Sequence, residues 1–217
     1  LNFTLKRLAE ISGIMIFFAG IILFIALFSY SPEDPNFIFP KDTEIKNLLG
    51  FKGSFISDLF FQSFGFIAYL ISLTYIITGI NMFRLKEFFL LIENTFVAIL
   101  YTIIGTLFLS HFYTSAFTLY INGNGGFVGN YFDQTFLNSI ILINEKLIYY
   151  ILLILIIALF LLSINFHLFK FYSSIIKIIK FFFKRENKSY TDKTELINEY
   201  IPQEEIKNLI QEDLPFI

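Results

Sequence analysis

The chain has 217 residues, of which 56% are hydrophobic and 20% aromatic, and its formal net charge is −2. It contains no cysteine, which excludes a disulfide framework, a thiolate metal site and a cysteine nucleophile. The apolar residues are gathered in blocks rather than dispersed, and this pattern indicates an all-α membrane protein rather than a soluble domain.

Four of these apolar blocks reach about 20 residues, the length that a helix needs to cross about 30 Å of hydrocarbon. The first block is too long for the apolar core of a signal peptide, and no small-x-small cleavage site follows it. We therefore predict four uncleaved transmembrane helices, with residues 1–10 as an N-terminal segment and residues 11–166 as the membrane domain. The spans are expected at about 11–30, 60–80, 88–110 and 147–166.

Basic residues indicate how the spans are oriented. They occur before the first span, between the second and third, and after the fourth, at Lys6, Arg7, Arg84, Lys86, Lys170 and Lys177 among others. The lysines of the first outer loop are offset there by acidic residues. Because cytoplasmic loops carry an excess of Lys and Arg, we expect both termini in the cytoplasm.

The second outer loop contains a flexible turn, Asn122 to Gly126, followed by apolar residues at helical spacing from Phe127 to Ile140. We expect one short interfacial helix there, lying on or dipping into the outer leaflet. A fifth span is disfavoured, because polar residues such as Asn130 and Asp133 would be costly in hydrocarbon.

A polar stripe follows the fourth span and predicts a basic amphipathic helix over 167–184. This helix would contact the anionic inner membrane surface through Lys170, Lys177, Lys180 and Lys184. A continuation of the fourth span that carries the positive-inside signal is the alternative, and the pattern leaves both open. Residues 185–217 hold eight acidic and four basic side chains, which indicates an acidic, solvated cytoplasmic linker.

Two acidic residues are candidates for chemistry within the spans. Glu93 is the ionisable residue inside the third span, and an intramembrane carboxylate is a functional candidate; alternatively it reaches the interface and pairs with a base such as Arg84. Asp58 is expected in the first turns of the second span, where the positive end of a helix favours an acid. The sequence contains no phosphate-loop, zinc-protease or serine-hydrolase motif, so we predict no catalytic, cofactor-binding or metal-binding residue.

The loops carry short motifs in a fixed order. The first span ends in Ser29-Tyr30-Ser31-Pro32-Glu33-Asp34-Pro35; Asn47-Leu-Leu-Gly50 and Gly53-Ser54-Phe-Ile-Ser-Asp58 follow, and Gly125-Gly126-Phe-Val-Gly129 precedes the fourth span. This order resembles the N-terminal four-span membrane domain of the FtsK/SpoIIIE DNA translocases. Ser54 and Ser57 depart from it, because alanine is usual there. The resemblance identifies ten residues as candidates for an interaction or structural role: Pro32, Asp34, Pro35, Asn47, Gly50, Gly53, Asp58, Gly125, Gly126 and Gly129.

The resemblance implies a membrane anchor in the bacterial inner membrane at the division septum. Its partners would be the lipid bilayer, membrane proteins of the division machinery and further copies of itself, six in the parent protein. DNA, ATP and Mg²⁺ would be bound by a motor that is absent from these residues, so no cofactor is expected here and the segment itself would not be an enzyme. Two other interpretations stay open: a small four-span carrier or channel subunit that uses Glu93, and a membrane sensor.

Overall fold

The computed structural model describes residues 2–35, 44–114, 122–166 and 176. These residues form seven helices and no strand: α1 (Asn2–Phe28), α2 (Gly50–Phe64), α3 (Ile67–Leu85), α4 (Leu90–Phe112), α5 (Gly126–Asp133), α6 (Phe136–Ile143) and α7 (Glu145–Ser163). Four of them, α1, α3, α4 and α7, are long and apolar enough to cross a membrane. The prediction of an all-α protein with four spans is therefore confirmed.

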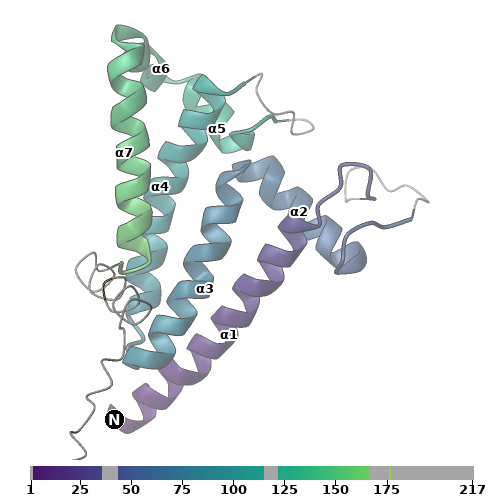
Figure 1. Cartoon of the computed structure of the whole chain (residues 1–217), viewed down its shortest axis with the longest axis vertical. Helices are drawn as coiled ribbons and strands as arrows, with labels where there is room; N and C mark the ends of the chain where they lie inside the picture. The colour runs from purple at the N-terminus through teal and green to yellow at the C-terminus, as the bar shows by residue number, and fades with distance from the viewer. Residues whose placement is uncertain (1, 36–43, 115–121, 167–175, 177–217) are drawn as a thin grey trace, which may run out of the picture. The chain divides into compact units, whose positions relative to one another are not determined.

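All seven helices lie in the first of two units into which the chain divides, residues 1–167. Within it α1 packs along α3, α3 packs on α4, and α4 packs on α7, so the spans follow one another in that order (Figure 1). Small residues bring α1 and α3 close together, since a Cβ atom on Gly79 would lie only 2.6 Å from the carbonyl oxygen of Gly13. Buried apolar residues from α3 and α4 form the main core: Ile67, Ile71, Ala98 and Tyr101.

The two ends of this helical unit differ. At one end, Lys86 in the short turn after α3 places its Nζ atom 2.8 Å from Glu10 Oε1, and Glu10 also pairs with Arg7 at 2.6 Å. The α3–α4 turn therefore lies beside the first part of α1. The other end carries α2, α5 and α6 (Figure 1). We call this end the cap and define it as the described residues of 29–66 and 122–143.

The second span begins at Ile67 and not at residue 60, because Phe60–Phe64 belong to α2. The chain turns at Gly65, whose φ of 57° favours glycine, and the Gly65 amide closes α2 by donating to the Phe61 carbonyl at 2.8 Å. A Cβ atom at Gly65 would also overlap with the carbonyl group of Asn124. The helix is thus interrupted at Gly65, between α2 and α3, at a point where the distant loop residue Asn124 packs against the backbone.

The other expected elements compare as follows. The first span begins earlier than residue 11, at Asn2, whereas the third and fourth spans end within a few residues of the prediction. The prediction of a single interfacial helix between Phe127 and Ile140 is wrong, because two helices, α5 and α6, occupy this segment. Thr135 divides them, since its side chain accepts a hydrogen bond from the Leu137 amide at 3.4 Å and begins α6. The predicted basic helix 167–184 and linker 185–217 lie outside the described residues, Ile176 excepted.

Candidate functional site

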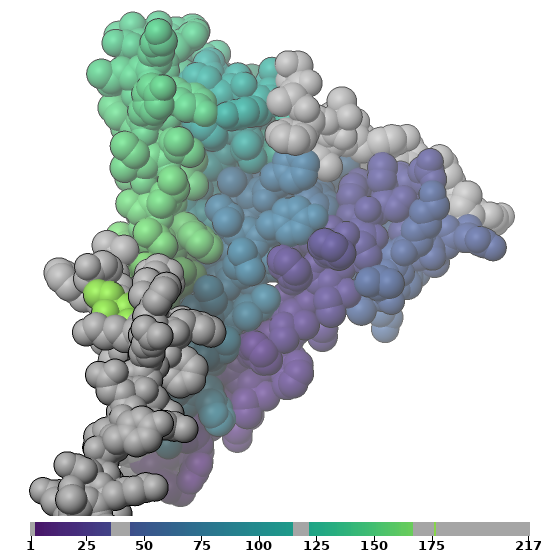
Figure 2. Space-filling model, viewed as in Figure 1, coloured from purple at the N-terminus to yellow at the C-terminus, as the bar shows by residue number. Residues whose placement is uncertain are grey.

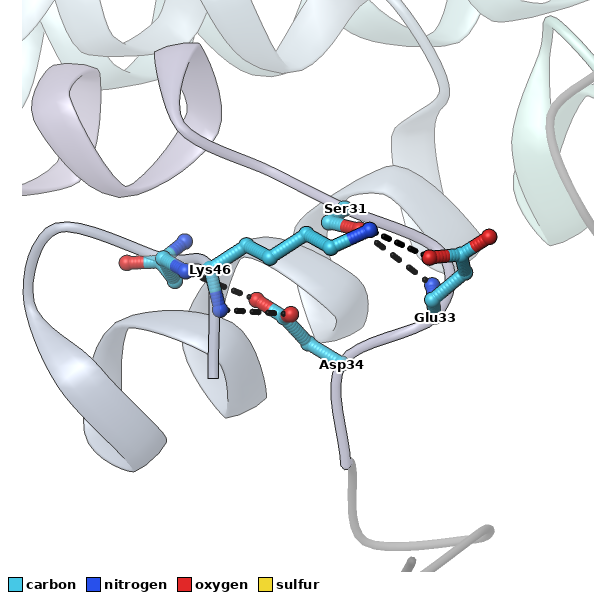
Figure 3. Close-up of polar contacts among 5 residues, drawn as sticks. Ser31, Glu33, Asp34 and Lys46 are labelled. Atoms are coloured by element: carbon cyan, nitrogen blue, oxygen red, sulfur yellow. Dashed lines mark hydrogen bonds and ion pairs between the residues drawn. The ribbon is translucent and has the colours of Figure 1, made fainter. Parts of the chain in front are cut away.

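The acidic turn after α1 is organised by one buried carboxylate, Asp34, which is 4% exposed. Its two oxygens accept hydrogen bonds from the backbone amides of Lys46 at 2.8 Å and Asn47 at 2.9 Å (Figure 3). Two amides that donate to one carboxylate fix the two segments of the loop against each other. Asp34 therefore joins the beginning of the loop to the segment that enters α2.

The prolines on either side of this turn have different surroundings. Pro32 is exposed, whereas Pro35 is buried and its carbonyl oxygen accepts a hydrogen bond from Ser54 Oγ at 2.9 Å. On the exposed side, the Glu33 carboxylate pairs with the Lys46 ammonium group (Figure 3). The hydrogen bond to Glu33 raises the pKa of Lys46, because it stabilises the charged ammonium form. Glu33 and Lys46 thus form the polar edge of the cap.

Asn47 ties the loop to the end of α1. Its Nδ2 atom donates to the carbonyl oxygens of Ala26 at 2.9 Å and Ser29 at 3.3 Å, and its Oδ1 atom accepts from the Leu49 amide at 3.0 Å. The last carbonyls of a helix have no partner within the helix, and inside a membrane such groups must be satisfied by the protein. Asn47, which is 4% exposed, supplies that partner from a position distant in sequence.

The glycines of the first motif have separate roles. Gly50 adopts a φ of 66° at the start of α2, with open space around it. Gly53 is buried against Asn47, and a Cβ atom there would overlap with Asn47 Oδ1. Gly53 therefore provides the room in which the Asn47 side chain reaches α1.

Asp58 lies in the middle of α2 rather than in the first turns of a span, so its predicted position was wrong. It is 8% exposed, and its Oδ1 atom lies 3.3 Å from the Tyr30 hydroxyl and 3.5 Å from Gln62 Nε2. These contacts hold α2 against the residues that follow α1. The carboxylate therefore acts within the cap and does not interact with the positive end of a helix.

The second set of glycines packs α5 onto α4. Cβ atoms at Gly125 and Gly129 would overlap with Ser110 Oγ and with the Thr106 carbonyl oxygen, and one at Gly126 would lie 2.6 Å from the Ser63 carbonyl. These glycines let the backbone of α5 touch α4 and the end of α2 directly.

Direct hydrogen bonds link the two motif-bearing loops. The Phe66 amide donates to the Asn124 carbonyl at 3.0 Å, and Asn122 Nδ2 donates to the Gln62 backbone carbonyl at 3.2 Å and to Gln62 Oε1 at 3.3 Å. The residues singled out in the two loops, far apart in sequence, are thus parts of one folded cap.

Two groups of predicted residues lie elsewhere. Glu93 is exposed in the first turn of α4, and none of the ion pairs among the described residues joins it to Arg84. The membrane-surface lysines Lys170, Lys177, Lys180 and Lys184 lie outside the described residues. Within the part of the chain that the structure describes, no three acidic or histidine side chains come close enough to hold a metal ion.

The structure adds a buried polar cluster that the sequence reasoning missed. Thr74 Oγ1 on α3 lies 2.9 Å from the Tyr101 hydroxyl on α4 and 3.1 Å from Ser163 Oγ on α7, and all three residues are buried. Such hydrogen bonds hold transmembrane helices together in the absence of a hydrophobic driving force.

Asparagines continue this cluster toward the end of α7. Asn94 donates to Thr78 Oγ1 and accepts from Asn165 Nδ2, each at 2.9 Å, while Asn81 Nδ2 donates to the Ile164 carbonyl at 3.1 Å. Amide side chains inside apolar blocks were the available signal, but only ionisable residues were considered as candidates. The end of α7 is thereby fastened to both α3 and α4.

These features define the class of protein: a four-span helical membrane domain whose loops at one end fold into a single glycine-dependent cap. Residues 5–176 match the family model described as the 4TM region of DNA translocase FtsK/SpoIIIE, and the chain belongs to this family. The match includes every motif residue from Pro32 to Gly129 on which the resemblance depended.

Individual relatives agree with this assignment. DNA translocase FtsK of Rickettsia typhi is 26% identical over 176 residues, which cover 80% of this chain and 23% of the relative. That of Rickettsia prowazekii is 28% identical over 136 residues (62% and 18%), and that of Azospirillum brasilense is 35% identical over 79 residues (36% and 12%). The chain thus spans less than a quarter of the length of these relatives. No solved structure matches it significantly.

Proposed function

We propose that this chain is the membrane anchor of a DNA translocase that acts in cell division and chromosome segregation. The observation that carries the proposal is the family match over residues 5–176, in a chain whose relatives are named as DNA translocases and are much longer. In this view DNA binding, ATP and Mg²⁺ belong to a motor outside these residues. The segment itself performs no catalysis and collects copies of the chain, six in the complete assembly.

The proposed orientation puts both termini in the cytoplasm and the cap on the outer face of the inner membrane. Four spans return the chain to the side on which it began. Lys6, Arg7, Arg84 and Lys86 belong to the end that carries the α3–α4 turn, and cytoplasmic loops are rich in such residues. A thiol-reactive dye that cannot cross the membrane should therefore label a cysteine at Lys46 in intact cells but not one at Lys86.

The cap is the surface that we propose for contacts with membrane proteins of the division machinery at the septum. Its support is chemical: the motif residues Asp34, Asn47 and Gly53 are buried and hold the loop in one shape, while Pro32 and Glu33 remain exposed on it. A loop whose shape is fixed in advance loses less conformational entropy when a partner binds.

A charge reversal tests this role without unfolding the cap. Glu33→Arg should reduce septal localisation of a fluorescently tagged full-length protein while leaving its membrane insertion unchanged. Glu87→Arg is the matched control, because Glu87 is equally exposed but lies at the opposite end, after α3. Normal septal localisation of the Glu33 variant would contradict a role of the polar edge of the cap in recruitment.

A further inference from the structure

Helix α2 has its polar side inside the protein and its apolar side outside. Four of its five buried residues are small or polar, namely Gly53, Ser54, Ser57 and Asp58, and the fifth is Phe61. On the opposite side Phe51 is 52% exposed and Leu59 is 53% exposed. Helices on the surface of soluble proteins show the reverse arrangement, with apolar residues toward the core.

The buried polar groups of α2 are satisfied, so this arrangement is not a packing defect. Ser54 Oγ donates to the Pro35 carbonyl at 2.9 Å, and Ser57 Oγ donates to the Ser54 carbonyl at 3.0 Å. Asp58 is held by Tyr30, as described above. Because the polar side is fully used within the cap, the apolar side is the one that meets the surroundings.

The exposed side of α2 continues the lipid-facing surface of a transmembrane helix. Phe28 at the end of α1 is 73% exposed, and α1 packs directly on α2. In Figure 2 the purple surface of α1 runs without a break into the blue-violet surface of residues 44–64. A lipid leaflet covers such a continuous surface, whereas a docked protein would cover a bounded patch.

A second cap helix has the same inside-out pattern. On α5 the buried residues are Gly126 and Gly129, while Phe127 and Tyr131 are stacked on each other and about 60% exposed. Aromatic residues are favoured at the boundary between headgroups and acyl chains. Two helices from different loops thus turn apolar and aromatic side chains outward at the same end of the spans.

We propose that α2 lies at the headgroup–acyl boundary of the leaflet nearest the cap, with Phe51 and Leu59 against lipid acyl chains. Lys52, on the same exposed side near the start of α2, reaches toward the headgroups with its long side chain. The start of α2 is therefore the shallower end and Leu59 the deeper one. Among the described residues of the first loop, the polar edge with Glu33 and Lys46 then remains available to a protein partner.

This inference rests on the four-span membrane fold and not on septal recruitment, so the two can fail separately. The chain has no native cysteine, and a nitroxide can be attached to single cysteines in the full chain. The variants are Phe51→Cys and Leu59→Cys, with Lys46→Cys as the aqueous control and Ile22→Cys, half-exposed on α1, as the lipid control. Each is reconstituted into phosphatidylcholine–phosphatidylglycerol vesicles and exposed to oxygen or to a water-soluble nickel chelate.

The proposal expects a label at Leu59 to collide with oxygen about as often as one at Ile22 and rarely with nickel, and Phe51 to lie between Leu59 and Lys46. Leu48→Cys, at a 73% exposed position, replaces Phe51→Cys if that variant does not insert. Nickel accessibility at Leu59 equal to that at Lys46 would overturn the proposal. Protection from both reagents that disappears on dilution with lipid would overturn it in favour of contact between copies of the chain.

Discussion

Replacing Asn47 with alanine tests whether the cap depends on one side chain. The variant loses four hydrogen bonds: Asn47 Nδ2 donates to the carbonyl oxygens of Ala26 and Ser29 and, at 3.4 Å, to Ser57 Oγ, and Asn47 Oδ1 accepts from the Leu49 amide. Each contributes about 0.5–1.5 kcal/mol net, and a buried group left unsatisfied costs toward the upper end of that range. Because Asn47 is 4% exposed, water cannot replace the lost partners. The free energy of opening the cap should therefore fall by about 2–4 kcal/mol.

The opening of the cap can be measured in lipid vesicles by the labelling rate of a single buried thiol. Ser54→Cys supplies it, because Ser54 is 2% exposed and cysteine is close to serine in size. When closing is faster than labelling, the rate follows the population of the open form, so Asn47→Ala should accelerate labelling about 30- to 700-fold.

Lys46→Ala is the matched control for this experiment. Lys46 is the neighbouring residue and its ion pair with Glu33 is exposed, so its removal should change the labelling rate little. If Asn47→Ala and Lys46→Ala label at the same rate, the hydrogen bonds of Asn47 do not hold the cap closed, and the reasoning above is refuted.

Three further predictions concern α5, the end of α7 and the third span. Gly129→Ala should lower the free energy of unfolding of the reconstituted chain by about 1–3 kcal/mol, because the added Cβ atom overlaps with α4. The decrease should exceed that of Gly123→Ala, where the surrounding space is open and only the positive φ opposes alanine. Asn94→Ala removes the hydrogen bonds to Thr78 and Asn165 and should lower the free energy of unfolding by about 1 kcal/mol, measured by thermal unfolding of the reconstituted chain. An unchanged free energy of unfolding would mean that these hydrogen bonds do not stabilise the bundle. Vesicles that contain the unsubstituted chain and vesicles that contain Glu93→Gln should show the same background ion flux. A flux that is present with the unsubstituted chain and lost with Glu93→Gln would favour a carrier instead.

The sequence allowed the number and type of the long elements to be predicted, because block length and apolar content determine what can cross a bilayer. The ends of the elements were less predictable. Residues 60–64 contain three phenylalanines and adjoin the apolar block of the second span, and the turn at Gly65 against Asn124 assigns them to α2. The early part of α1 carries Glu10, which pairs with Arg7 nearby and with Lys86 from a distant turn that a single sequence does not bring into view.

For the candidate site, the order of the motifs singled out residues that lie together in the cap, but it did not show how they contact one another. Nothing in the spacing of Asp34 and Asn47 shows that the first accepts a hydrogen bond from the amide of the second. Nor does it show that glycines of a second loop, such as Gly126, meet the end of the helix that follows Asn47. Long-range packing, which a single sequence does not display, decides each of these points.

The attachment of the end of α7 has a mechanical consequence. A pull on the chain beyond residue 166 reaches the bundle at Ile164 and Asn165, where Asn81 and Asn94 hold adjacent residues from two different helices. The two hydrogen bonds are arranged in parallel, so tension is shared between them rather than borne by one bond after the other. Separating the C-terminal end of α7 from the bundle therefore requires both hydrogen bonds to break. The same force is divided between α3 and α4 before it reaches the cap.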